Sequence, residues 1–273
     1  MLSSTHDLEK YAIQASDGEI GAVKDFYFDD DSWVVRYLVV EAGSWLTSKK
    51  VLISPVSIHN PDGVSRTFPV SITKEQVRKS PDIDTDKPIS RQNEEQYMGY
   101  YGYGSYWDGA GLWGDGLYPY GMVPGNIGYG MDRVEREREM EAYLRSERQR
   151  HRNDDPHLRS CKAVTGYHLQ ANDGEVGHLS DFLLDEKTWA IRYLIVDTSN
   201  WWMGHKVLVA PEWITGVHWS NKTVSVDLSR EAVKSAPVYE SNETWTLQSE
   251  LNLRGHYGRA GYWSDSLATV DAV

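Results

Sequence analysis

The stretch DGEIGAVKDFYFDDDSWVVRYLVV, residues 17–40, decides the fold, because it returns later in the chain as DGEVGHLSDFLLDEKTWAIRYLIV, residues 173–196. Residue 17 corresponds to residue 173, and the same offset of 156 residues aligns the two copies without a gap. Self-similarity at a constant offset indicates an internal duplication. The 273-residue chain therefore contains two related units.

The repeat continues beyond this stretch at the same offset. Pro55 matches Pro211, Pro81 matches Pro237, and the pair Tyr106-Trp107 matches Tyr262-Trp263. This extent predicts a first domain over residues 1–107, a linker over 108–156, and a second domain over 157–273.

Each copy is predicted to be mainly β. The Asp-Gly dipeptides at the start of both copies suit tight hairpins, and the apolar run from Trp33 to Val40 is typical of a strand buried on both faces. Thr73 and Ser229 stand where helix N-caps are preferred, each followed by a short helical stretch. We expect two small antiparallel β-barrels, each with a short helix.

The connection between the copies has two parts of different composition. Tyrosine and glycine dominate residues 97–130, which predicts a loop or low-complexity linker. Residues 131–153 interleave acidic and basic side chains, and opposite charges three or four residues apart favour a solvated helix. The expected linker therefore combines a Gly/Tyr-rich segment with a charged helix.

The repeated motif, together with Lys50-Val-Leu-Ile-Ser-Pro55, closely resembles the PRC-barrel family. That family includes the cytoplasmic domain of the photosynthetic reaction-centre H subunit and a relative in a ribosome maturation factor. The resemblance implies the barrel fold in each copy, in a tandem two-barrel protein. It also implies a partner in a membrane-associated electron-transfer complex or a ribosome-related factor. The chain differs from the H subunit in lacking an N-terminal membrane helix and in carrying a second barrel.

Charge and composition narrow the classes of function. Lys and Arg number 28 against 40 Asp and Glu, a net charge of −12, which argues against a nucleic-acid partner. No apolar run approaches the length of a membrane helix, and the N-terminus shows no secretory signal, so a cytoplasmic location is expected. A single cysteine, Cys161, excludes a multi-cysteine metal site. The histidines His178 and His205 have no histidine counterparts in the first copy. We therefore predict no enzyme activity, no catalytic residues, no cofactor and no metal.

Two sets of side chains are candidates for structural or interface roles. Arg36 and Arg192 lie inside apolar strands and need partners, for which Asp25 and Asp181 are proposed. Asp29, Asp30 and Asp31 form an expected exposed hairpin turn, with a Ca²⁺ site as the alternative. Recurring tryptophans fill a core or anchor an interface. The interface candidates are Trp45, Trp107, Trp201, Trp202 and Trp263.

These observations favour a non-enzymatic assembly or protein-interaction module with a protein partner of unknown identity. The duplication is consistent with a fused two-fold contact, and aromatic arms after Pro81 and Pro237 are expected to exchange between the barrels. One alternative is a reaction-centre H-subunit-like role that supports electron or proton transfer. Another is a binding module like a ribosome or RNA maturation factor. A dimer and a peripheral place in a membrane complex both stay open.

Overall fold

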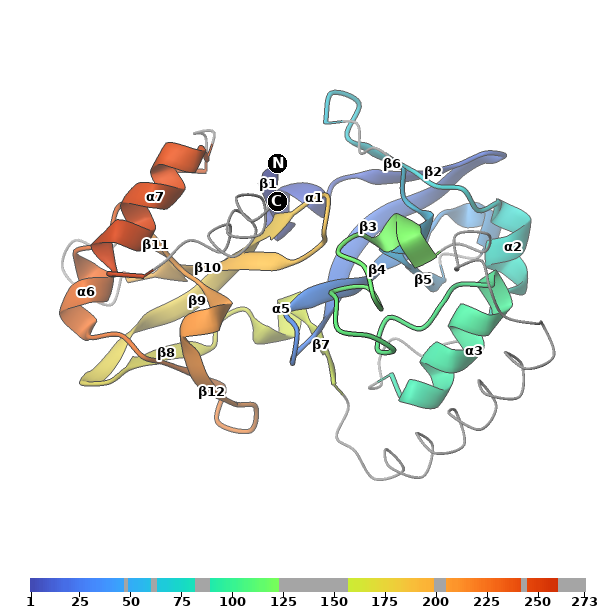
Figure 1. Ribbon diagram of the computed structural model, residues 1–273. Helices are drawn as coiled ribbons and strands as arrows, with labels where there is room; N and C mark the ends of the chain where they lie inside the picture. The colour runs from blue at the N-terminus through green and yellow to red at the C-terminus, as the bar shows by residue number, and fades with distance from the viewer. Residues whose placement is uncertain are drawn as a thin grey trace, which may run out of the picture. The chain divides into compact units, whose positions relative to one another are not determined.

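A computed structural model of the chain describes residues 1–46, 49–59, 63–81, 89–122, 157–198, 205–241 and 245–259 (Figure 1). The charged helix expected at 131–153 lies outside these residues. Within the described parts, equivalent elements of the two repeats recur 156 residues apart, from the first strand to the last helix. The duplication seen in the sequence is therefore a duplication of structure.

The first repeat forms a six-stranded sheet with strand order β5-β4-β3-β2-β6, and β7 also pairs with β3. β3 and β4 form its long central hairpin. The strands are β2 (Ala12–Ala15), β3 (Gly18–Asp29), β4 (Val34–Ala42), β5 (Lys50–Ile53), β6 (Thr67–Pro69) and β7 (Leu158–Ser160).

The second repeat forms a seven-stranded sheet with order β11-β10-β9-β8-β13-β12, and β1 also pairs with β9. Among the described residues, the counterpart of strand β12 in the first repeat is the isolated bridge between Ile58 and Val70. The strands are β1 (Leu2–Ser4), β8 (His168–Ala171), β9 (Gly174–Asp185), β10 (Ile191–Asp197), β11 (Lys206–Val209), β12 (Ile214–His218) and β13 (Thr223–Val226).

Both sheets are mixed, so the expectation of purely antiparallel sheets is wrong. β2 pairs with β6 in parallel, and β8 pairs with β13 in parallel. The parallel pairs arise because β6 and β13 come back to β2 and β8 in the same direction, after the intervening strands and the 3₁₀ turns η2 (Pro55–Ser57) and η4 (Pro211–Trp213). Among the described strands, no hydrogen-bonded pair joins the two ends of either strand order.

β4 shows why the central strand is so apolar. Every residue from Val34 to Val40 is buried, including Arg36, as the run of apolar residues predicted. Gly21 permits the close approach of β3 to β4, because a Cβ at Gly21 would meet the carbonyl oxygen of Glu41 at 2.0 Å. The equivalent Gly177 stands in the same relation to Asp197, at 2.3 Å.

The short helices predicted after Thr73 and Ser229 are confirmed. They are α2 (Lys74–Lys79) and α6 (Arg230–Lys234), and in each the predicted cap accepts a backbone N–H from within the first turn. The other short elements are α1 (Thr5–Leu8), α5 (Cys161–Val164), η1 (Ser44–Leu46) and η3 (Pro119–Met122). None of the described helices is long and apolar enough to cross a membrane.

Two longer helices correct the assignment of the arms. Residues 97–101 were predicted as loop, but they end helix α3 (Arg91–Tyr101), and α7 (Leu247–His256) is its equivalent. Ser90 caps the start of α3, and Gly102 ends it in the left-handed conformation that glycine favours, with φ 71°. The Tyr97 hydroxyl donates to the carbonyl oxygen of Leu52 and accepts the Ser54 N–H, which holds α3 to its own sheet.

The short N-terminal strands are exchanged between the repeats, whereas the described helices α3 and α7 each bond to the sheet of their own repeat. β1 pairs with β9 and β7 pairs with β3, so each sheet is completed by a strand from the other repeat. The registers are equivalent, since Leu2 lies opposite Asp185 and Leu158 opposite Asp29. The chain accordingly divides into one compact unit of residues 1–7, 161–185 and 191–273, and a second of residues 8–160 and 186–190.

Candidate functional site

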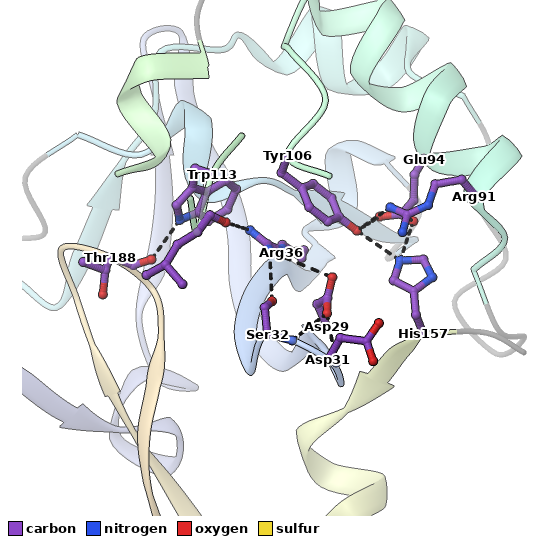
Figure 2. A network of polar contacts seen from close by, with 11 residues as sticks. Asp29, Asp31, Ser32, Arg36, Arg91, Glu94, Tyr106, Trp113, His157 and Thr188 are labelled. Carbon is purple, nitrogen blue, oxygen red and sulfur yellow. Dashed lines mark hydrogen bonds and ion pairs between the residues drawn. The ribbon is translucent and has the colours of Figure 1, made fainter. Parts of the chain in front are cut away.

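Arg36 is the centre of a buried polar network in the second unit (Figure 2). It lies on β4 with 2% of its surface exposed. Its guanidinium donates to the carbonyl oxygen of Leu112 and to the Ser32 hydroxyl, the latter at 3.0 Å. The Tyr106 ring centroid lies 3.9 Å from Arg36 Cζ and the Trp113 centroid 4.8 Å from it, so two aromatic faces flank the cation. Burial lowers the pKa of Arg36, and the nearby Tyr106 and Asp29 offset part of this effect.

Asp29 is both the counter-ion and the turn cap. Its Oδ2 lies 3.9 Å from Arg36 Nη2, while its Oδ1 accepts the N–H groups of Asp31 and Ser32 at 3.0 Å each. A side chain that holds a turn in this way explains the abrupt reversal between β3 and β4. The turn was expected to be exposed, but Asp29 is buried and only Asp31 of the three aspartates is exposed.

A second group of titratable side chains adjoins Arg36 across the Tyr106 ring (Figure 2). Glu94, on α3, has no exposed surface and accepts a hydrogen bond from the Tyr106 hydroxyl at 2.5 Å. His157 Nε2 lies 2.8 Å from Glu94 Oε2 and 3.1 Å from the Tyr106 hydroxyl. Arg91 Nη1 donates to the same hydroxyl at 3.1 Å. Burial and the nearby Glu94 raise the pKa of Tyr106 well above its ordinary value, so the phenol stays protonated at neutral pH.

The other unit repeats part of this group at the equivalent positions. Tyr193 and Glu250 correspond to Tyr37 and Glu94, and the Tyr193 hydroxyl donates to Glu250 at 2.6 Å. Arg254 donates to the Tyr193 hydroxyl at 3.3 Å and pairs with Glu212. Each repeat thus buries a glutamate from its long helix beside a tyrosine of its central strand.

Sequence reasoning missed Glu94 and Glu250, although a signal was present. Both follow a glutamine by two residues, and the repeat offset also matches Gly99 with Gly255 and Tyr101 with Tyr257. The repeat had been followed as far as Trp107, but residues 91–96 were given no secondary structure and residues 97–130 were predicted as a loop. The repeated helix and its glutamate were therefore missed.

Hydrogen bonds of this network join the loop of residues 103–122 to Arg36 on β4 and to Thr188. Trp113 Nε1 donates to the carbonyl oxygen of Thr188 at 2.8 Å, and Leu112 receives the Arg36 hydrogen bond. The Gly/Tyr-rich residues 103–122 are therefore a packed loop, with Tyr106, Trp113 and Met122 buried. The polar atoms of the network contact one another, an arrangement suited to holding chain segments together.

Each arginine of the predicted ion pairs lies beside an aspartate, but not beside the aspartate that was predicted. Arg36 pairs with Asp29, and Arg192 pairs with Asp185 at 3.5 Å, where Asp25 and Asp181 had been proposed. Asp25 accepts the Ser160 hydroxyl at 2.6 Å, and Asp181 accepts the Thr5 hydroxyl. The reason is the strand exchange: these two aspartates face the incoming segments β7–α5 and β1–α1.

Two of the three aspartates in the candidate metal cluster, Asp29 and Asp30, accept hydrogen bonds from donors of the chain itself. Carboxylate oxygens of Asp29, Asp30 and Asp31 lie within 4.8 Å of one another. Asp30 Oδ2 accepts from Arg159 Nε at 2.7 Å, and burial raises the pKa of Asp30 although Arg159 opposes the change. The turn reading explains these contacts, and the Ca²⁺ alternative gains no support from them.

The tryptophans divide between core and surface. Trp33, Trp189 and Trp213 are buried, which favours core filling for these three. Trp45 and Trp107 are half-buried. Arg91 lies 4.2 Å from the Trp107 ring centroid, and Trp45 donates from Nε1 to the carbonyl oxygen of Ile20 at 2.8 Å. The remaining interface candidates lie outside the described residues: Trp201, Trp202 and Trp263.

Comparison with known proteins assigns a domain to part of the chain. The family model of the PRC-barrel domain matches residues 2–77, within the first repeat. An uncharacterized protein of Deinococcus radiodurans is 33% identical over 89 residues, which are 29% of this chain and 32% of that relative. The chain therefore spans about a third of the length of the relative.

Proposed function

From the PRC-barrel domain at residues 2–77, we propose that this chain is a non-catalytic protein-interaction module built from two PRC-type barrels. The second barrel is inferred from the equivalent strands and helices of residues 157–259. In each barrel the long helix would cover the sheet, and the exchanged strand would complete it. The outward face of the helix would then be available to a partner.

The observation that carries this proposal is the outer face of α7. Leu247 and Leu251 lie one turn apart and are 61% and 45% exposed, while Leu253 and Arg254 on the same helix are buried. The equivalent positions on α3 are Arg91 and Glu95, so only the second repeat has leucines here. Exposed apolar side chains gathered on a fixed helix are typical of a protein contact.

The test is affinity capture from the native cell with the full chain and with a Leu247→Ser, Leu251→Ser variant. A matched control carries Leu117→Ser and Tyr120→Ser, because these exposed residues of the 103–122 loop belong to the other unit. We expect a specific protein that the α7 variant loses and the loop variant keeps. The captured protein should then bind the purified chain directly. Equal retention by both variants, or no specific protein, would contradict the proposal.

One observation favours the H-subunit-like alternative. Buried Glu94 and Tyr106 and half-buried His157 form a titratable cluster, as a role in proton handling requires. A captured component of a membrane electron-transfer complex would support this alternative. A captured ribosomal protein would support the maturation-factor alternative. Direct binding of RNA is disfavoured by the net charge of −12.

A further inference from the structure

A row of polar side chains crosses the sheet of the second repeat on the neighbouring strands β8, β9 and β10 (Figure 1). His168 on β8 lies directly opposite His178 on β9, and His178 lies directly opposite Asp197 on β10. Residues that are directly opposite in antiparallel strands point to the same face of the sheet, with Cβ atoms about 4.5–5.5 Å apart. Two imidazoles and one carboxylate therefore occupy adjacent positions on one face.

This face is accessible to solvent at the row. His168 is exposed, and His178 and Asp197 are half-buried. The adjacent Leu169 and Leu179 are each 1% exposed, and successive side chains of a strand alternate between its two faces. The row therefore lies on the side of the sheet away from these buried leucines, where a small ion can reach it from solution.

Glu175, also on β9, holds the ring of His168. Its Oε1 lies 3.0 Å from His168 Nδ1, and because a carboxylate only accepts hydrogen bonds, Nδ1 carries a proton. In a neutral ring the lone pair is then on Nε2. Histidines that ligate metals commonly donate their other ring N–H to a carboxylate in this way, which fixes the tautomer and the orientation of the ring. The contact between Glu175 and His168 is therefore of the kind that supports a metal ligand.

The first repeat has the same row without the histidines. At the offset of 156 residues the equivalent pairs are His168 with Ala12, His178 with Ala22, and Asp197 with Glu41. The two alanines also lie directly opposite each other, and the glutamate lies opposite Ala22. Both members of one cross-strand pair thus differ between repeats whose backbone pairing is the same. Since alanine serves in the equivalent pairing, the sheet itself does not require histidine at either position.

We propose that His168, His178 and Asp197 bind a divalent transition-metal ion, for which Zn²⁺ is the best match. Zn²⁺ takes imidazole nitrogens and carboxylate oxygens in a tetrahedral set, and three protein ligands leave the fourth position to water or to another ligand. Two imidazoles favour a transition metal over Ca²⁺ or Mg²⁺, which prefer oxygen ligands. Glu175 is a positioning residue that acts through His168. The site belongs to the second repeat alone and goes beyond the proposed interaction role.

The donor atoms of the row have to come together around the ion. Among the described residues, the three aspartates of the β3–β4 turn are the only group of three whose donor atoms lie within 4.8 Å of one another. Binding at the row therefore requires rotation of the His178 ring and the Asp197 carboxylate. In the described part of the chain, no hydrogen bond or ion pair restrains the His178 ring. The expectation of no metal rested on spacing along the chain, which does not show that residues 168 and 178 are cross-strand neighbours.

The test is isothermal titration of the full chain, without an affinity tag, with zinc chloride. We expect a bound zinc ion whose affinity falls at least about tenfold in a His168→Ala, His178→Ala variant. These substitutions introduce the residues of the first repeat, so the variant should fold, which circular dichroism checks. The matched control His59→Ala, His218→Ala removes two exposed histidines and should leave the affinity nearly unchanged. His218 lies two strands from His168, roughly 10 Å away.

The positioning role of Glu175 is tested separately. Glu175→Ala should weaken zinc binding about tenfold, because an orienting carboxylate is lost. Ring ¹⁵N chemical shifts should show the Nδ1–H tautomer of His168 in the unmodified chain and a loss of that preference in the variant. Weaker zinc binding with an unchanged tautomer would contradict this role.

Three outcomes would overturn the proposal. The His168→Ala, His178→Ala variant could bind zinc as tightly as the unmodified chain, or the control variant could lose as much affinity as this variant does. Calcium chloride could displace the zinc at equal concentration, which would indicate a site made of carboxylates alone. The Leu247→Ser, Leu251→Ser variant should bind zinc like the unmodified chain, so the metal site and the interaction role can fail independently.

Discussion

At the scale of single residues, the stability of this protein depends on cations and phenols that are buried with partners. Arg36 illustrates the point, because three oxygens and two aromatic faces surround a guanidinium that is almost inaccessible to water. Removing one member of such a group leaves the others buried without compensation.

We predict that Arg36→Ala lowers the free energy of unfolding by about 3–5 kcal/mol. Arg192→Ala is the matched control, since Arg192 holds the equivalent position with a side chain that is 21% exposed against 3% for Arg36. Its loss should be about half as large or smaller. Urea denaturation followed by circular dichroism measures both losses of free energy. Equal losses would show that the deeper burial of Arg36 does not increase its contribution to stability.

Buried tyrosines predict a loss of stability in alkali. Burial raises the pKa of Tyr103 and of Tyr239 to about 12, and raises that of Tyr37, Tyr97 and Tyr106 further. The unfolded chain releases these protons near pH 10 while the folded chain retains them. The folded state therefore binds more protons above pH ~10, and the free energy of unfolding must fall as the pH rises through that range.

The measurement is urea denaturation at several pH values between about 8 and 11, combined with phenolate absorbance of the folded chain. Tyr103→Phe should make the fall shallower by about one proton, because it removes one retained proton. A free energy of unfolding that stays constant above pH ~10 would contradict the proposed burial of these phenols.

At the scale of elements, the exchanged strands separate sequence order from structural membership. β1 belongs to the first repeat by sequence, yet it pairs with β9, and the Thr5 hydroxyl beside it donates to Asp181. Ser4 and Thr5 are both buried in this arrangement. The first seven residues therefore stabilise the sheet of the second repeat.

Deleting residues 1–7 should raise the rate of amide hydrogen exchange in β9 at Leu183–Asp185, because these residues lose their β1 partner. The equivalent residues of β3, Tyr27–Asp29, pair with β7 and serve as the internal control, with unchanged exchange. Mass spectrometry of peptides from both strands measures the effect. Faster exchange confined to β3 would show that β1 belongs with its own repeat.

Helix α3 shows how far a helix of this protein could be predicted from its sequence. Ser90 as N-cap and Gly102 as C-cap were readable signals, but the tyrosines and glycines that follow made the segment look like a linker. Burial of Tyr97 and Glu94 against β4 and β5 overrides that composition.

At the scale of the whole molecule, the strand exchange follows from the duplication, because both repeats carry the same strand and the same site for it. The pairing of β1 with β9 uses the same register as that of β7 with β3. A single repeat would carry the exchanging strand and, on β3, an unpaired site for it. Two copies of one repeat should then exchange strands reciprocally.

An isolated fragment of residues 1–122 should accordingly form a dimer, whose mass light scattering measures. The matched fragment 8–122 lacks β1 and should be monomeric, because it keeps the acceptor edge of β3 and has lost the exchanging strand. A monomeric 1–122 fragment would contradict reciprocal exchange.

By itself, the sequence determined the duplication, the β-rich repeats, the fully buried central strand and the caps of the short helices. These follow from local patterns, since periodicity and turn chemistry act between near neighbours. Only the tertiary structure decided which edge receives β1 and β7, which acid pairs with Arg36, and that Glu94 is buried. The physical reason is that the two repeats offer equivalent edges and similar acids, and the choice among equivalents depends on which segments the folded chain brings together.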